Sequence, residues 1–262
     1  MNNFHKKIGV AYLVRGKDHD WIGSCERFIN SYTRKPAGIK HTLHVIFKGF
    51  EHESDLKLAV EKFKSTRHHS IFVDDDKFDI GAYIEWANHT DEDEVCMFNT
   101  SSEILATDWL LKFVNNLRRP DVALVGATSS YESLGELNYS FPQFPNIHIR
   151  SSGFMMSREM FCILTRDIPL NSKIDAYHFE SGPRSLTRKV LALGKHALLV
   201  GRNGRGYSPH LWPHSETFRQ GSQDNLLIGD NQTRNYLSLT WNEKREAVVR
   251  TWGDFINSKY RL

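Results

Sequence analysis

The sequence predicts an α/β protein in which a central, mostly parallel sheet is flanked by helices. Short, nearly continuous apolar runs are typical of strands buried on both faces, and they alternate with longer segments whose apolar residues recur at helical spacing. This alternation through the first half of the chain indicates parallel strands joined by right-handed crossovers. No internal repeat or low-complexity linker divides the 262 residues, so we expect one domain.

The first half of the chain supplies the regular part of this pattern. We expect strands at 8–14, 43–47, 71–73, 95–98 and 122–126, where β-branched and other apolar residues cluster. The intervening helices are expected at 21–32, 54–63, 78–87 and 107–117. Each of these segments has an apolar face, and the first is closed by the helix-breaking run 36–38.

The second half departs from this alternation. We expect a strand over 150–157, a short helix over 158–165, a helix over 182–193 and a strand over 197–200. Residues 202–223 form a long polar segment rich in Gly, Pro and His, which is typical of a lid or binding loop. The chain then has an amphipathic pattern over 242–260, which predicts a C-terminal helix.

The composition excludes several classes of protein. The 34 basic and 31 acidic residues are interleaved, and the net charge of +3 comes with no long Lys/Arg run. We therefore expect no nucleic-acid partner, although an anionic small ligand is compatible with this balance.

Cys25, Cys96 and Cys162 lie far apart among apolar neighbours, as free thiols in a reducing compartment do. No apolar run approaches the ~20 residues of a membrane span, and the N-terminus lacks a signal-peptide pattern, so we expect a cytoplasmic protein without a transmembrane segment.

One stretch marks where a ligand should bind. The apolar strand Val95–Phe98 ends abruptly in small polar side chains, Asn99, Thr100 and Ser101. In open α/β sheets, ligands bind at the carboxyl ends of the strands. The sequence therefore predicts a site for a small polar substrate at this end of the sheet.

Five segments together resemble a known family. They are IGVAYLVRG at the first strand, FDIGAY after the third, CMFNTSSEI at the fourth, IRSSGFMMSREMF in the middle of the chain and FESGPRSLTRKVLALGK later on. In this order the chain resembles the GT-A glycosyltransferases, and among them the family-2-like bacterial sugar transferases. The resemblance covers most of the chain. It implies one glycosyltransferase domain over 1–262, with a nucleotide-sugar-binding half, 1–128, and an acceptor-binding half, 129–262, that ends in a helix.

The resemblance implies a pocket for a nucleoside diphosphate sugar. Its nucleotide-binding residues would be Val14, Arg15, Asp75, Asp79, Tyr83, Asn99, Thr100 and Ser101. In GT-A enzymes the fourth strand usually ends in Asp-X-Asp, whose carboxylates hold a divalent cation against the diphosphate. Here that position is Asn-Thr-Ser, so we expect Mn²⁺ or Mg²⁺ to bind weakly or not at all, and Arg or Lys side chains to neutralise the diphosphate. Alternatively, the three polar residues cap the helix over 107–117.

The resemblance also points to a catalytic base. Family-2 transferases carry an acidic pair near the position of Glu180, and inverting transfer needs a carboxylate to take the proton of the acceptor hydroxyl. Asp175 is a reserve for this role, and the alternative for Glu180 is an acid that complements a helix N-terminus. The residues expected around the sugar and acceptor are Arg150, Ser152, Gly153, Asp175 and His214.

These features predict transfer of a sugar, with inversion, from a nucleoside diphosphate to a carbohydrate acceptor in polysaccharide or glycan synthesis. Two alternatives remain open. One is a non-catalytic GT-A-like module that binds glycans or a partner protein. The other is a nucleotidyltransferase, whose Gly-rich basic signature after the first strand is matched only faintly by residues 15–19. The polar run 230–234 has no explanation from periodicity.

Overall fold

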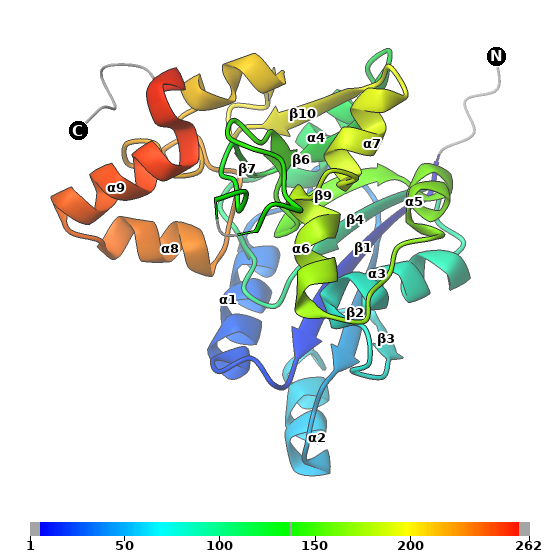
Figure 1. Ribbon diagram of the computed structural model, residues 1–262. Helices are drawn as coiled ribbons and strands as arrows, with labels where there is room; N and C mark the ends of the chain where they lie inside the picture. Colours follow the sequence, from blue (N-terminus) through cyan, green and yellow to red (C-terminus); the bar gives the residue numbers. More distant parts are fainter. Residues whose placement is uncertain (1–5, 137, 257–262) are drawn as a thin grey trace.

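The computed structural model describes residues 6–136 and 138–256. Within them, the central sheet has eight strands in the order β11-β10-β6-β9-β4-β1-β2-β3 (Figure 1). In that order they are β11 (Gly206–Tyr207), β10 (His196–Val200), β6 (Val122–Gly126), β9 (Gly153–Ser157), β4 (Glu94–Phe98), β1 (Ile8–Arg15), β2 (Thr42–Lys48) and β3 (His69–Phe72). Only β9 and β11 run antiparallel to their neighbours. The predicted mostly parallel sheet is confirmed.

Helices cover both faces of this sheet. They are α1 (Trp21–Arg34), α2 (Glu53–Lys62), α3 (Phe78–His89), α4 (Trp109–Leu117), α5 (Arg158–Thr165), α6 (Lys173–Ser181), α7 (Leu186–Ala192), α8 (Asn231–Ser238) and α9 (Trp241–Trp252). Along β1, Val10 and Tyr12 face a core shared with α1 and α4, whereas Ala11 and Leu13 face a core shared with α3, α5, α6 and α7. Successive side chains of a strand point to opposite faces, so one apolar run serves both cores.

Short elements complete the fold outside the main sheet. They are the antiparallel pairs β5 (Glu103–Ile104) with β12 (Ile228–Gly229) and β7 (Ser129–Ser130) with β8 (His148–Ile149), and the 3₁₀ helices η1 (Pro209–His214) and η2 (Gly253–Phe255). The first pair ties the segment after β4 to the segment before α8. Among the described residues, no helix is both long and apolar enough to cross a bilayer. Cys25 and Cys96 are buried free thiols, and Cys162 is a partly buried one.

Three expectations need correction. The helix expected over 182–193 is shorter, because the backbone leaves helical geometry at Gly182 and α7 starts only after the N-cap Ser185. The segment 202–223 is not an open loop: it contains β11 and η1, and Trp212, Phe218 and Gln220 are buried. The last helix starts at Trp241 and ends at Trp252, and the expected continuation over 257–260 lies outside the described residues.

Candidate functional site

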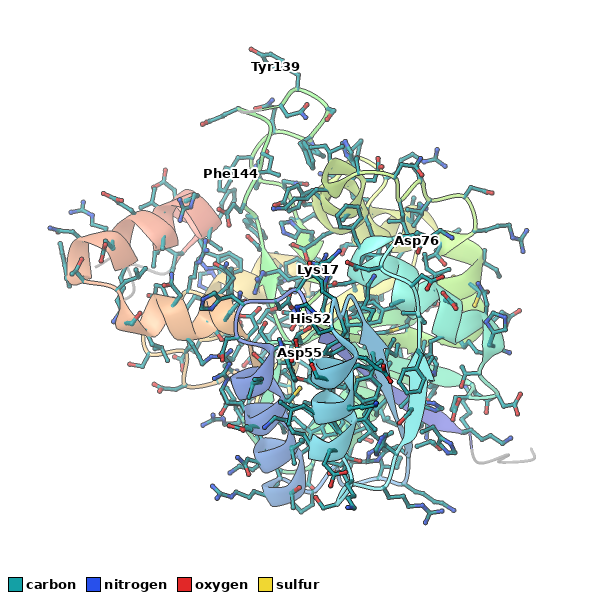
Figure 2. The ribbon with its side chains drawn as sticks, turned by 90° about the horizontal axis from the view of Figure 1, so that it is seen from below. Lys17, His52, Asp55, Asp76, Tyr139 and Phe144 are labelled. Atoms are coloured by element: carbon teal, nitrogen blue, oxygen red, sulfur yellow. The ribbon has the colours of Figure 1, made fainter. Side chains whose placement is uncertain are left out.

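A cavity of about 630 Å³ opens where β1 and β4 end. It lies between the loop after β1, the polar turn after β4, and helices α1, α3 and α8. Figure 2 views the molecule from this side, and Lys17 lies near the middle of the face. The residues of this strand-end cavity are Lys17, Asp18, His19, Asp20, Ser24, Arg27, Asp79, Asn99, Thr100, Ser101, Asn231 and Arg234.

The turn after β4 forms one wall of the cavity and is held by its own hydrogen bonds. The Asn99 Oδ1 atom accepts hydrogen bonds from the hydroxyls of Ser101 and Ser102, at 3.2 and 2.9 Å. The Thr100 hydroxyl accepts one from the Arg15 amide at 3.2 Å, and the Thr100 carbonyl accepts one from the Tyr12 hydroxyl at 2.7 Å. The turn is therefore fixed in place before any ligand binds.

The alternative that this turn caps a helix is wrong. The chain enters β5 at Glu103 immediately after the turn, and α4 begins only at Trp109. The small polar side chains instead bond to one another and to the end of β1. Asn99, Thr100 and Ser101, which the sequence assigns to nucleotide binding, line the cavity.

Three of the other expected nucleotide-binding residues lie behind the cavity wall. The carboxylate of Asp75 forms ion pairs with Lys17 at 2.9 Å, Arg15 at 3.3 Å and Lys48 at 3.4 Å. Burial alone would raise the pKa of Asp75, but its hydrogen bonds to Lys17 and Arg15 bring it below its ordinary value. Val14 is fully buried in the core. Arg15, Asp75 and Val14 thus support the loop after β1, and none of them lines the cavity.

Asp79 lines the cavity and lacks a partner. It makes no hydrogen bond or ion pair with any described residue, and burial, reinforced by the nearby charge of Asp18, raises its pKa to about 6. Arg15 and Lys48 oppose this rise only in part. One turn further along α3, the side chain of Tyr83 is wholly buried, so it does not reach the cavity. An unpaired carboxylate beside a cavity is a hydrogen-bond acceptor available to a ligand.

The cationic wall comes from elements that sequence reasoning missed. Arg27 of α1 donates hydrogen bonds to Asp20 and to Ser24. Arg234 of α8 pairs with Glu103 at 3.3 Å and donates to the carbonyl of Ser101 at 3.1 Å. The sequence contained one indication of Arg234: it is the last residue of the polar run 230–234, which helical or strand periodicity does not explain.

Glu180 does not line the strand-end cavity. It lies in the last turn of α6, so the alternative role at a helix N-terminus is wrong: an acid at this end opposes the helix dipole. Its Oε2 atom accepts hydrogen bonds from the amide of Ser151, at 2.7 Å, and from the hydroxyl of Ser151. The next residue, Ser152, accepts a hydrogen bond at its carbonyl from Ser102, at 2.7 Å. Through this path Glu180 is joined to the turn after β4.

The other expected acceptor residues have structural partners or lie apart. Arg150 forms a buried ion pair with Asp230 at 2.8 Å and lies over the ring of Phe218. The hydroxyl of Ser152 bonds to Thr128, and Gly153 starts β9 against the ring of Phe98. Asp175, the reserve candidate for the catalytic base, completes the capping box of α6. Its carboxylate therefore has a structural role. His214 is exposed at the end of η1 and is not among the residues that line the cavity.

Comparison with known proteins identifies the fold. No protein-family model and no curated protein sequence matches the chain. Among solved structures, a mannosyltransferase from Pyrobaculum calidifontis in complex with GDP-Man and Mn²⁺ is 13% identical over 82% of this chain, with a TM-score of 0.50. This chain spans only 62% of that protein. Mouse xyloside xylosyltransferase 1 is 12% identical over 74% of this chain and 84% of its own, with a TM-score of 0.45. The chain has the GT-A fold.

A first prediction follows from the unpaired Asp79. A carboxylate whose pKa is raised in the folded state adds stability at low pH that is lost as the pH rises through about 6. Asp79→Asn should therefore raise the melting temperature by a few degrees near pH 7.5 and leave it nearly unchanged near pH 4. Asp76→Asn, at an exposed carboxylate in the same segment, is the matched control and should show no such pH dependence. An equal effect of Asp79→Asn at both pH values would contradict this account.

Proposed function

We propose that this chain is a glycosyltransferase that moves a sugar from a nucleoside diphosphate to a hydroxyl of a carbohydrate acceptor. The observation that carries the proposal is the strand-end cavity. It lies at the edge of the sheet where α/β folds bind ligands, and its volume suits a ligand of nucleotide-sugar size. The GT-A neighbour from Pyrobaculum binds GDP-Man, which is a donor of the class proposed here.

The cavity walls differ in charge, which suggests how the donor lies. Asp79 can accept hydrogen bonds from a nucleobase or from ribose hydroxyls, both of which carry donors. The turn after β4 and the arginines of α1 and α8 provide donors that suit phosphate oxygens. The nucleoside would therefore lie toward α3, and the diphosphate toward the end of β4.

Glu180 is the proposed base for the transfer step. One carboxylate oxygen is anchored by Ser151, and the other, Oε1, makes no hydrogen bond within the described residues. As the acceptor oxygen attacks the anomeric carbon, the bond from that carbon to the diphosphate oxygen breaks and its electron pair leaves with the diphosphate. The acceptor proton passes to Oε1, and the configuration at the anomeric carbon inverts.

The donor class can be tested by thermal shift. UDP, GDP, dTDP and CDP should be compared with the corresponding nucleoside triphosphates, and one diphosphate should raise the melting temperature most. The Asp79→Asn variant should lose most of that nucleotide's stabilisation, because the acceptor group facing the nucleoside is weakened. Stabilisation by a triphosphate alone, with release of pyrophosphate on addition of a sugar phosphate, would establish a nucleotidyltransferase instead.

The role of Glu180 can be tested by Glu180→Gln. The amide keeps the shape of the side chain but cannot accept the proton, so turnover should fall on the order of 10²- to 10⁴-fold while donor affinity and melting temperature stay near wild type. Asp175→Asn is the control, because it alters the cap of the same helix and should lower the melting temperature slightly without a comparable loss of turnover. Near-normal turnover of Glu180→Gln would remove Glu180 from the mechanism. Glycan binding without any turnover of the wild-type protein would favour the non-catalytic module.

A further inference from the structure

The turn after β4 does not suit the divalent cation that accompanies the GT-A neighbour from Pyrobaculum. Mn²⁺ and Mg²⁺ prefer carboxylate and other free oxygen ligands. Here the side chains are an amide and two hydroxyls, and the Asn99 oxygen already accepts two hydrogen bonds. The Thr100 hydroxyl and carbonyl are used by the end of β1. No group of three His, Cys, Asp or Glu residues in the described part of the chain is placed to hold a metal ion.

Two carboxylates around this turn, Asp20 in the cavity lining and Glu103 just after the turn, already pair with arginines. Asp20 receives the guanidinium of Arg27, and Glu103 receives that of Arg234. Both arginines line the cavity, one from α1 and one from α8. Arg27 uses Nη2 for Asp20 and Ser24, and Arg234 uses Nη1 for Glu103 and Nη2 for the Ser101 carbonyl. Each five-donor guanidinium therefore keeps N–H groups without an acceptor among the described residues, and the Arg27 Nε is buried without a partner.

The positive charges of Arg27 and Arg234 also act on each other. Burial lowers the pKa of Arg234, and the charge of Arg27 lowers it further. Two like charges facing one cavity repel each other, and an anion between them would relieve that repulsion. Neutral donors complete this wall: the Nδ2 groups of Asn99 and Asn231 make no hydrogen bond within the described residues, whereas the Oδ1 atoms of both accept from Ser101.

We propose that Arg27 and Arg234, assisted by Asn99 and Asn231, bind the donor diphosphate in place of a divalent cation. The inference rests on the proposed function and assigns the group that stabilises the leaving nucleoside diphosphate. As the bond to the anomeric carbon breaks, the electron pair moves to the diphosphate oxygen, and the guanidinium groups take up the growing negative charge by charge-assisted hydrogen bonds.

Calorimetric titration of the full chain tests this proposal. The probes are UDP, GDP, dTDP and inorganic pyrophosphate, each titrated once with EDTA and once with Mn²⁺. We expect the affinity for the bound diphosphates to differ by less than about twofold between the two conditions. Arg27→Gln and Arg234→Gln should each weaken binding by about 10- to 100-fold, which is the range for a lost hydrogen bond to a charged group. Arg245→Gln, at an exposed arginine of α9, removes the same charge outside the cavity and should leave binding unchanged.

A further variant guards against loss of folding in the arginine variants. Asn99→Asp restores a carboxylate at the strand end, so it should weaken diphosphate binding in EDTA and recover part of it when Mn²⁺ is added. Binding that disappears in EDTA, or that survives both arginine substitutions in folded protein, would overturn the proposal that Arg27 and Arg234 bind the diphosphate. The proposed function would still stand. Pyrophosphate binding without any nucleotide binding or sugar transfer would support phosphate binding by the two arginines and reject the proposed function.

Discussion

The antiparallel pairing of β9 between β4 and β6 is the constraint on which the site depends. It places Gly153 opposite Phe98, so the segment that precedes β9 meets the end of β4. Ser102 can then donate a hydrogen bond to the carbonyl of Ser152, while the neighbouring Ser151 holds Glu180. A parallel strand at this position would carry residues 150–152 to the opposite edge of the sheet. One reversal of strand direction thus joins the proposed base to the turn that lines the strand-end cavity.

The buried ion pair between Arg150 and Asp230 links the same segment to α8. Asp230 also caps α8 through the amide of Thr233, and the charge of Arg150 helps to keep the pKa of Asp230 low despite burial. Removing one member of a buried pair typically costs about 3–5 kcal/mol, because the other charge is left uncompensated. The pair therefore fixes the position from which Arg234 reaches the cavity. Arg150, which the sequence assigns to the acceptor, instead supports the helix whose Arg234 lines the strand-end cavity.

The sequence predicted those parts of the molecule that depend on local patterns. Buried strand runs and helical spacing located the parallel strands, and the polar end of β4 located the turn that lines the cavity. Arg27 and Arg234 could not be found in this way, because they lie 207 residues apart and meet only through the packing of α1 and the β5–β12 pair. The same limit explains why Arg150 was assigned to the acceptor. Nothing local to residue 150 indicates an ion pair with residue 230.

The central claim is that a nucleotide sugar binds at the ends of β1 and β4, with its diphosphate held by protein cations. The most direct measurement is a crystal structure of the full chain with the bound nucleoside diphosphate, grown in EDTA. The account predicts electron density for the diphosphate between Arg27 and Arg234, next to Asn99, with the nucleoside directed toward Asp79. Density for the nucleotide outside this cavity, or binding only in crystals that also hold a divalent cation at the β4 end, would contradict it.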